Sequence, residues 1–199
     1  LAAIYLIFNE GYTATTGDEL TRTNLSAEAI RLARVLVELM PDEAEAAGLL
    51  ALMLLTDARR AARTDDDGSL VRLADQDRSR WDRALIAEGH ELVRACLRRN
   101  MPGPYQIQAA IAAVHTDAAT AGATDWTQVI ALYDQLHAIQ PTDVVALNRA
   151  IAIAEVHGPR AGLDALESVQ LDSYHLLHAT RADLYARLHL VEEATAAYD

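Results

Sequence analysis

Helical periodicity along almost the whole chain is the feature that most limits its fold. In the stretch 26–40, Ile30, Ala33 and Val37 recur at the spacing that places them on one face of a helix. Ala and Leu, both strong helix formers, dominate the composition, whereas the 199 residues include 9 Gly and 5 Pro. No stretch of the sequence alternates convincingly between apolar and polar residues as a strand does. We therefore expect an all-α fold with a sizeable core.

Proline and N-cap residues mark where the expected helices begin and end. Pro41 ends the helix of 26–40. Asp42 is followed three residues later by Glu45, which is the spacing of a capping box for the next helix. Asp125 and Gln128 repeat that spacing. The sequence thus predicts helices that begin just after Asp42 and Asp125.

A degenerate repeat occupies the second half of the chain. Residues 154–167 align without gaps on residues 186–199, with Ala and His matching at equivalent positions. The spacing and the helix-pair pattern resemble tetratricopeptide repeats (TPRs), although His189 and Leu190 stand where a turn glycine is expected. We expect a right-handed α-solenoid of TPR-like helix pairs with a concave face. It would form a single domain over residues 1–199, with divergent helices in 1–100 and clearer pairs in 101–199.

The charge distribution argues against direct binding of nucleic acid by this chain. The net charge is −12, and phosphate backbones need clustered positive charge. All 17 basic residues are Arg, and ten of them lie between positions 57 and 99 together with nine acidic residues. We call this stretch the arginine belt. It either pairs internally with the acidic residues or forms a docking face for an acidic partner.

Cysteine usage and hydropathy indicate a cytoplasmic protein. The single Cys96 excludes an internal disulfide and, beside apolar helix positions, is expected to be a core thiol. The apolar start of the chain lacks the basic region of a signal peptide. The longest apolar runs fall well short of the roughly 20 residues that cross a membrane.

Each pattern that could indicate catalysis or a cofactor is incomplete. His175 and His178 lie one helical turn apart but have no third ligand at a recognisable spacing. The acidic runs near positions 65 and 75 lack the Gly and Glu of a calcium loop. The stretch 11–17 has no Gly-Lys-Ser/Thr, and Cys96 has no obvious His and Asn partners. We expect no catalytic residue, cofactor or metal, and not an enzyme.

Several peptides together resemble the bacterial extracytoplasmic-function (ECF) sigma factors that carry a long C-terminal helical-repeat extension. They lie at residues 5–20, 28–55, 76–89, 102–115, 124–136 and 144–155. The resemblance implies that sigma core domains stand upstream of this region and are absent from it, and that the full-length protein binds DNA and directs RNA polymerase to promoters. It implies partners in the sigma core of the same protein, in the polymerase, or in both. The alternative is a ligand-sensing or peptide-binding adaptor solenoid.

The positions that match the family's motifs form the candidate site. They are Asn9, Glu10, Gly11, Tyr12, Asp77, Arg78, Arg80, Trp81, Asp82, Tyr105 and Gln106. Two interpretations stay open, a polar network that joins the first helices to the middle of the chain, and a contact with a partner or ligand. We expect the first helix to end near Asn9, with Glu10 and Tyr12 reaching the arginines around Trp81, and a loop over residues 13–19.

Overall fold

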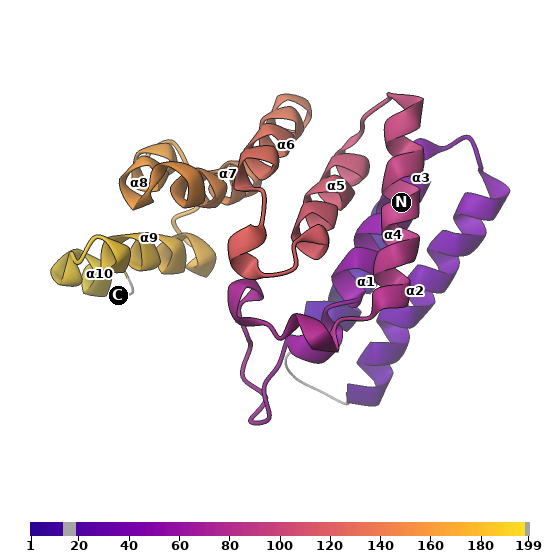
Figure 1. Cartoon of the computed structure of the whole chain (residues 1–199), viewed down its shortest axis with the longest axis horizontal. Coiled ribbons are helices and arrows are strands. Elements are labelled where there is room, and N and C mark those ends of the chain that lie inside the picture. Colours follow the sequence, from indigo (N-terminus) through magenta and orange to yellow (C-terminus); the bar gives the residue numbers. More distant parts are fainter. Residues whose placement is uncertain (14–18, 198–199) are drawn as a thin grey trace. The chain divides into compact units, whose positions relative to one another are not determined.

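The computed structural model describes residues 1–13 and 19–197, and its regular structure is helical (Figure 1). The described residues contain no strand, which confirms the all-α prediction for them. The chain divides into two compact units, Leu1–Thr124 and Asp125–Asp199. The first contains α1 (Ala2–Thr13), α2 (Glu19–Leu39), α3 (Ala44–Asp57), η1 (Arg60–Ala62), η2 (Leu73–Asp75), η3 (Arg78–Arg80), α4 (Arg83–Arg99), α5 (Pro104–Asp117) and η4 (Ala121–Ala123). The second contains α6 (Trp126–Ile139), α7 (Asp143–His157), α8 (Pro159–Leu166), α9 (His175–Arg187) and α10 (Val191–Ala196).

Helix α3 is the centre of the first unit. Its segment Leu49–Leu55 is apolar all round and entirely buried, as expected of a helix surrounded by others. Helices α1, α2, α4 and α5 all pack against it. One side of α3 meets Phe8 and Ile30, and the other meets Trp81 and Ile86. The ends of the surrounding helices are therefore fixed relative to the ends of α3.

Glycine allows two of these helices to approach α3 closely. A Cβ at Gly48 would lie 2.7 Å from the backbone N of Gln106 at the start of α5. A Cβ at Gly89 of α4 would lie 2.6 Å from Cγ of Leu55. Both separations are shorter than real carbon contacts, so a larger residue requires a helix or side chain to shift.

The second unit consists of helices that pack on their neighbours in sequence. Helix α7 packs on α6 and α8, and α9 packs on α8 and α10. A Cβ at Gly162 of α8 would lie 2.6 Å from Cβ of Ala154 of α7. The α7–α8 turn contains Gly158 at φ 89°, and the α9–α10 turn contains His189 at φ 60°. Both turns therefore have a residue with positive φ, a conformation that favours glycine. Glycine occupies that position in the α7–α8 turn, and histidine occupies it in the α9–α10 turn.

Local capping predictions have mixed outcomes. Gln128 N donates to the carboxylate of Asp125 at 3.0 Å, which confirms the predicted start of α6. The predicted capping box at Asp42 is wrong, because Glu43 is the N-cap of α3 and Glu45 turns to another helix. The first helix also runs further than predicted, to Thr13. The predicted loop falls largely on residues 14–18, outside the described residues.

The single domain over residues 1–199 stays a prediction. Helix α5, which the sequence placed among the clearer repeats of 101–199, packs on α3 and α4 in the first unit.

Candidate functional site

The predicted site residues Tyr105 and Gln106 belong to a network at the N-terminus of α5. The carboxylate of Glu45 accepts hydrogen bonds from Tyr105 N at 3.0 Å, Gln106 N at 3.1 Å and Gln106 Nε2 at 3.0 Å. A carboxylate at a helix N-terminus satisfies unpaired N–H groups and complements the helix dipole. A Cβ at Gly103 would overlap this carboxylate, so the residue before Pro104 has to be small. These residues form a structural connection between α3 and α5.

Asn9, Glu10 and Tyr12 on α1 have three different surroundings. The Asn9 side chain hydrogen-bonds the hydroxyl of Tyr5, whose pKa is raised chiefly by burial, and Asn9 opposes that shift. The Tyr12 ring lies under two guanidinium groups, with its centroid 5.2 Å from Cζ of Arg60 and 4.1 Å from Cζ of Arg63. Glu10 is exposed.

The prediction that Glu10 and Tyr12 reach the arginines around Trp81 is therefore wrong for Glu10, which α1 directs away from the core. Tyr12 does contact arginines, but they are those that follow α3. The reason is that α1 continues past Asn9 as a helix and carries Tyr12 to the C-terminal end of α3.

Asp77 and Asp82 are helix caps. Asp77 accepts from Ser79 N and Ser79 Oγ at the start of η3. Asp82 accepts from Ala84 N at 2.8 Å and Leu85 N at 3.1 Å at the start of α4. The Arg80 side chain between them is exposed. These three residues therefore direct their charge to local backbone or to solvent.

The half-buried Arg78 lies over the buried Trp81 in the first unit. Cζ of Arg78 is 4.4 Å from the Trp81 ring centroid, and Trp81 is 3% exposed. Nη1 of Arg78 donates to the carbonyl of His115 at 2.6 Å and to that of Ala118 at 2.8 Å. Arg78 therefore caps the C-terminus of α5 while it covers the indole.

Other arginines of the belt also bond to the carbonyl ends of helices. Arg60 Nη1 donates to Gly11 O at 3.4 Å and Arg63 Nη1 to Tyr12 O at 2.5 Å, both at the end of α1. Arg99 Nη2 donates to Pro41 O at 2.5 Å, just beyond the end of α2. The last carbonyls of a helix have no hydrogen-bond donor within the helix. The negative end of the helix dipole also attracts cations. Much of the belt thus pairs internally with helix ends as well as with acidic side chains.

Arg59, Arg63 and Arg78, together with His115 and Trp81, form what we call the arginine cluster. Burial lowers the pKa of Arg59, Tyr12 acts in the opposite direction, and nearby Arg63 lowers it further. Burial lowers the pKa of Arg78, and so do Arg59 and Arg83. Burial, reinforced by Arg59 and Arg78, lowers the pKa of His115 from 6.5 to about 4. Burial first, and the two arginines second, therefore keep His115 neutral well below pH 6.5.

Two hydrogen-bond donors in this region are buried without an acceptor. They are Nε of Arg59 and Nε1 of Trp81, and Oε1 of Gln76 is a buried acceptor without a donor. Unsatisfied buried polar atoms are infrequent in folded proteins and call for an explanation. Among the described residues, Arg59, Arg63 and Arg78 form no ion pair with a carboxylate, whereas Arg60 pairs with Asp57 at 2.5 Å.

Sequence reasoning selected only part of this cluster. It chose Arg78 and Trp81, but not Arg59, Arg63 or His115. The signal was available in the run DARRAAR at residues 57–63, since arginines directly after a long apolar helix are placed to meet carbonyl ends. The contribution of His115 depends on where α5 ends relative to α3, which no local pattern contains.

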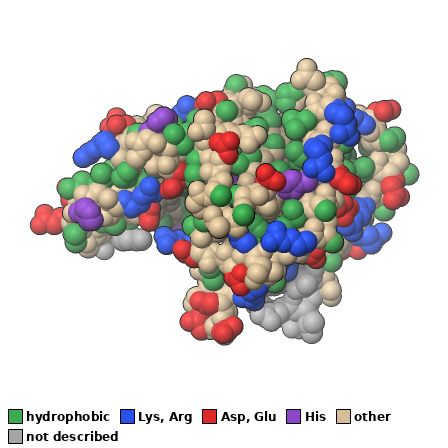
Figure 2. Space-filling model, viewed as in Figure 1, with side chains coloured by type: hydrophobic (Ala, Val, Ile, Leu, Met, Phe, Trp, Pro, Cys, Tyr) green, Lys and Arg blue, Asp and Glu red, His purple; other side chains and the backbone are tan. Residues whose placement is uncertain are grey.

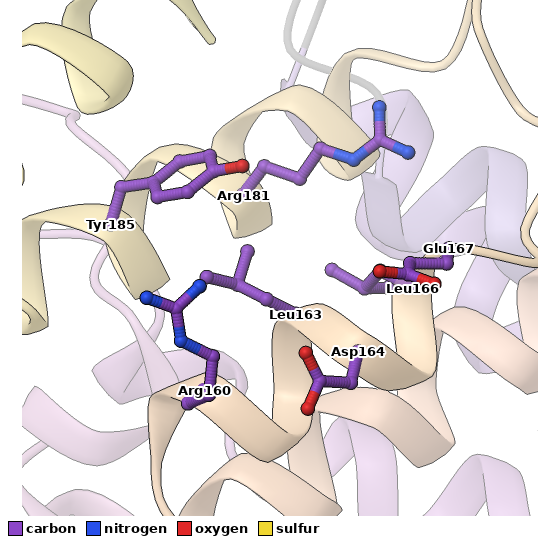
Figure 3. Close-up of a pocket in the computed structure, with 7 residues that line it drawn as sticks. All are labelled: Arg160, Leu163, Asp164, Leu166, Glu167, Arg181 and Tyr185. Atoms are coloured by element: carbon purple, nitrogen blue, oxygen red, sulfur yellow. The ribbon is translucent and has the colours of Figure 1, made fainter.

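The second unit has a small surface pocket between α8 and α9 (Figure 3). Its volume is about 250 Å³, and its lining is Arg160, Leu163, Asp164, Leu166, Glu167, Arg181 and Tyr185. In Figure 3 the two guanidinium groups lie at separate positions around the pocket, with the carboxylates on the α8 side. The mixed charges and small size suit a contact with a side chain better than enclosure of a cofactor.

Cys96 and the histidines noted in the sequence have structural surroundings. Cys96 is buried, burial raises the pKa of its thiol, and Sγ lies 3.6 Å from the carbonyl of Ala44, which confirms a core thiol. His178 Nε2 lies 2.7 Å from the carbonyl of Asp172, and the His175 ring meets Tyr174. Over residues 1–13 and 19–197, no three His, Cys, Asp or Glu side chains gather as metal ligands would.

Two further observations concern the surface. On the face shown in Figure 2, acidic side chains gather at the tip of the loop between η1 and η2, where Asp65, Asp66 and Asp67 are exposed. Arginines on that face are interspersed with apolar and acidic side chains. None of the helices that the structure describes has the length and apolarity needed to cross a bilayer.

Comparisons with known proteins identify relatives without an assigned activity. Residues 1–97 match the model of DUF6596, a family of unknown function. An uncharacterized protein of Rhizobium meliloti (strain 1021) is 45% identical over 198 residues, which is 98% of this chain. The chain spans 47% of the length of that relative. No solved structure matches the chain.

Proposed function

We propose that this chain is the regulatory, protein-interaction region of an ECF-type sigma factor, which directs RNA polymerase to promoters. The region would act through contacts with the sigma core domains of the same polypeptide or with the polymerase. It would be a cytoplasmic binding module without catalytic activity, and DNA contacts would belong to the full-length protein.

The observation that supports this proposal is how the peptides of the resemblance pack. The four at residues 5–20, 28–55, 76–89 and 102–115 contribute to α1, α2, α3, α4 and α5, which surround and include the central helix of the first unit. The two at residues 124–136 and 144–155 form most of α6 and α7. The matching residues therefore build the framework of both units, as expected if the whole arrangement is shared with the family.

The helix pairs of the second unit support the finer prediction of TPR-like repeats. Helices α7 and α8 pack against each other through Gly162 and Ala154, and α8 in turn packs on α9. The positive-φ turns at Gly158 and His189 lie 31 positions apart, close to the period found in the sequence. We propose that these pairs stack as units of a right-handed solenoid, with a surface that receives a protein segment.

A transcription assay with purified RNA polymerase tests the function. The full-length protein is compared with a version that lacks the region equivalent to residues 1–199, on a cognate promoter and at equal concentration. We expect the deletion to change the rate of promoter-specific transcription, and the separately purified region to bind the sigma core or the polymerase. Unchanged transcription, polymerase binding and stability of the truncated protein would contradict the proposal.

A further inference from the structure

The arginine cluster of the first unit has more positive charge than its described surroundings neutralise. Arg59, Arg63 and Arg78 are half-buried and form no ion pair with the described carboxylates. The acidic residues closest to them in the chain are engaged elsewhere. Asp57 bonds Arg60, Asp65 accepts a hydrogen bond from Ser69 N, and Asp77 accepts one from Ser79 N. A cation held in a partly buried site without a partner is unfavourable unless an anion joins it.

Helix ends supply part of the compensation, and its size can be estimated. The C-termini of α1 and α5 accept hydrogen bonds from Arg63 and Arg78, and Arg59 directly follows the C-cap of α3. Each helix C-terminus is equivalent to about half a negative elementary charge. The two that accept these hydrogen bonds together offset about one of the three elementary charges of the guanidinium groups. The remainder is comparable to the charge of one small multivalent anion.

The unsatisfied donors provide a second, independent indication. Nε of Arg59 and Nε1 of Trp81 are buried, and neither has an acceptor. Trp81 is 3% exposed and lies under the guanidinium of Arg78. Indole and guanidinium N–H groups only donate, so both need oxygen atoms that accept. A charged oxyanion would satisfy such donors with short, strong hydrogen bonds.

We propose that the arginine cluster binds a small phosphate-bearing anion, either free phosphate or a phosphate monoester. A phosphate group combines several acceptor oxygens with up to two negative charges, which suits three guanidinium groups better than a single carboxylate does. Arg63 and Arg78 each keep part of the side chain at the surface, where an anion can reach them, and Nε of Arg59 is buried. The bound anion would connect the ends of α1, α3 and α5. This inference is independent of the proposed role in transcription.

Ligand-dependent thermal stability of the whole chain tests the site. Unfolding is followed in inorganic phosphate, in glycerol 3-phosphate and in acetate, each against chloride at equal ionic strength and pH. A ligand that binds only the folded chain raises the melting temperature in a concentration-dependent way. We expect saturable stabilisation by phosphate, by the monoester or by both, which separates a free-phosphate site from one that prefers a phosphorylated metabolite. No stabilisation by either, or an equal effect of acetate, would overturn the proposal.

Substitutions then locate the binding. We expect Arg59→Gln to weaken the binding of the stabilising phosphate by about tenfold or more, because it removes a charged donor. The matched control is Arg31→Gln, since Arg31 is an exposed arginine paired with Glu28 on α2. If Arg59→Gln does not fold, Arg63→Gln replaces it. Equal affinity in the cluster variant and in the control would overturn the assignment to this cluster.

Discussion

In the first unit, charged side chains join helices far apart in sequence, whereas in the second unit the helices meet through small residues and turns. Glu45 bonds the start of α5, 60 and 61 positions further on, and Arg78 bonds its end. In the second unit, Gly162 lies against Ala154, and the ion pairs of Arg149 with Asp134 and Arg187 with Glu155 are at the surface. Surface pairs contribute little to stability.

The difference indicates how each unit tolerates change. A helix end that depends on a distant carboxylate or guanidinium loses several bonds when one side chain is removed. A pair of neighbouring helices depends on shape, so it is sensitive to an added methyl group and insensitive to loss of a surface charge. The single tryptophan in each unit, Trp81 and Trp126, allows the two to be followed separately.

The largest effect is expected for Glu45→Ala in the first unit. The substitution leaves two backbone N–H groups at the start of α5 and the Gln106 amide without their acceptor. We expect the free energy of unfolding to fall by about 3 kcal/mol. Urea unfolding followed by Trp81 fluorescence, in a Trp126→Phe background, measures it.

The matched control for Glu45 is Glu43→Ala. Glu43 is exposed and accepts one bond of 3.3 Å from Glu45 N at the start of α3. Its removal should cost about 0.5 kcal/mol. Equal losses for the two variants would show that the bonds across helices contribute no more than a local cap, and the contrast between the units would fail.

Lowering the pH is expected to have an intermediate effect on the stability of the first unit. Burial, together with Arg59 and Arg78, lowers the pKa of His115 from 6.5 to about 4. Between these two pH values the unfolded chain binds a proton that the folded chain does not. The free energy of unfolding is therefore highest above pH 6.5 and falls as the pH is lowered towards 4. Because His115 is half-buried, we expect this decrease to be about 2 kcal/mol.

Unfolding at pH 7 and pH 4 in phosphate-free buffer, again followed by Trp81, measures this loss. His115→Asn should flatten the pH dependence, whereas His137→Asn, at an exposed position of α6, should leave it unchanged. A His115→Asn variant with the same pH dependence as the parent would show that the protonation of His115 does not cause this loss of stability.

The smallest of the three effects is expected for Gly162→Ala in the second unit. The added Cβ would lie 2.6 Å from that of Ala154 and 3.2 Å from Cδ1 of Leu184, so α7 and α8 must separate slightly. We expect a loss of about 1–2 kcal/mol, measured by Trp126 fluorescence in a Trp81→Phe background. Gly122→Ala in the first unit, followed by Trp81 in a Trp126→Phe background, is the control, because its Cβ would have no neighbour within 4 Å. A neutral Gly162→Ala would mean that shape does not limit this pair.

How well the sequence predicted each feature depended on how local its cause is. The start of α6 followed from Asp125 and Gln128, since both partners lie within one helical turn. The same pattern misplaced the start of α3, because Glu45 has a second possible partner in α5 and binds that one instead. The first helix ran past Asn9 and Gly11 because packing of Phe8 on α3 outweighs the weak helix propensity of those residues.

The candidate site shows the same division. Tyr12, Arg78 and Trp81 were selected from the sequence, and in the structure Arg63 lies over the Tyr12 ring and Arg78 over the Trp81 ring. Asp77, Asp82, Tyr105 and Gln106 were selected as well, but they are helix caps or bond to Glu45. Arg59 and His115 were missed, because a side chain's charge environment depends on helices that are distant in sequence.

The sequence by itself determined that the chain is helical, where most helices lie, and that Cys96 is a core thiol, because periodicity, propensity and caps act over a few residues. Only the tertiary structure decided which helix ends meet. Packing around α3 brings the C-termini of α1, α3 and α5 to one region and turns ordinary belt arginines into a cluster with unsatisfied donors. The burial of these groups, and the absence of ion pairs from Arg59, Arg63 and Arg78 to carboxylates in the described part of the chain, result from that packing, and no local pattern contains them.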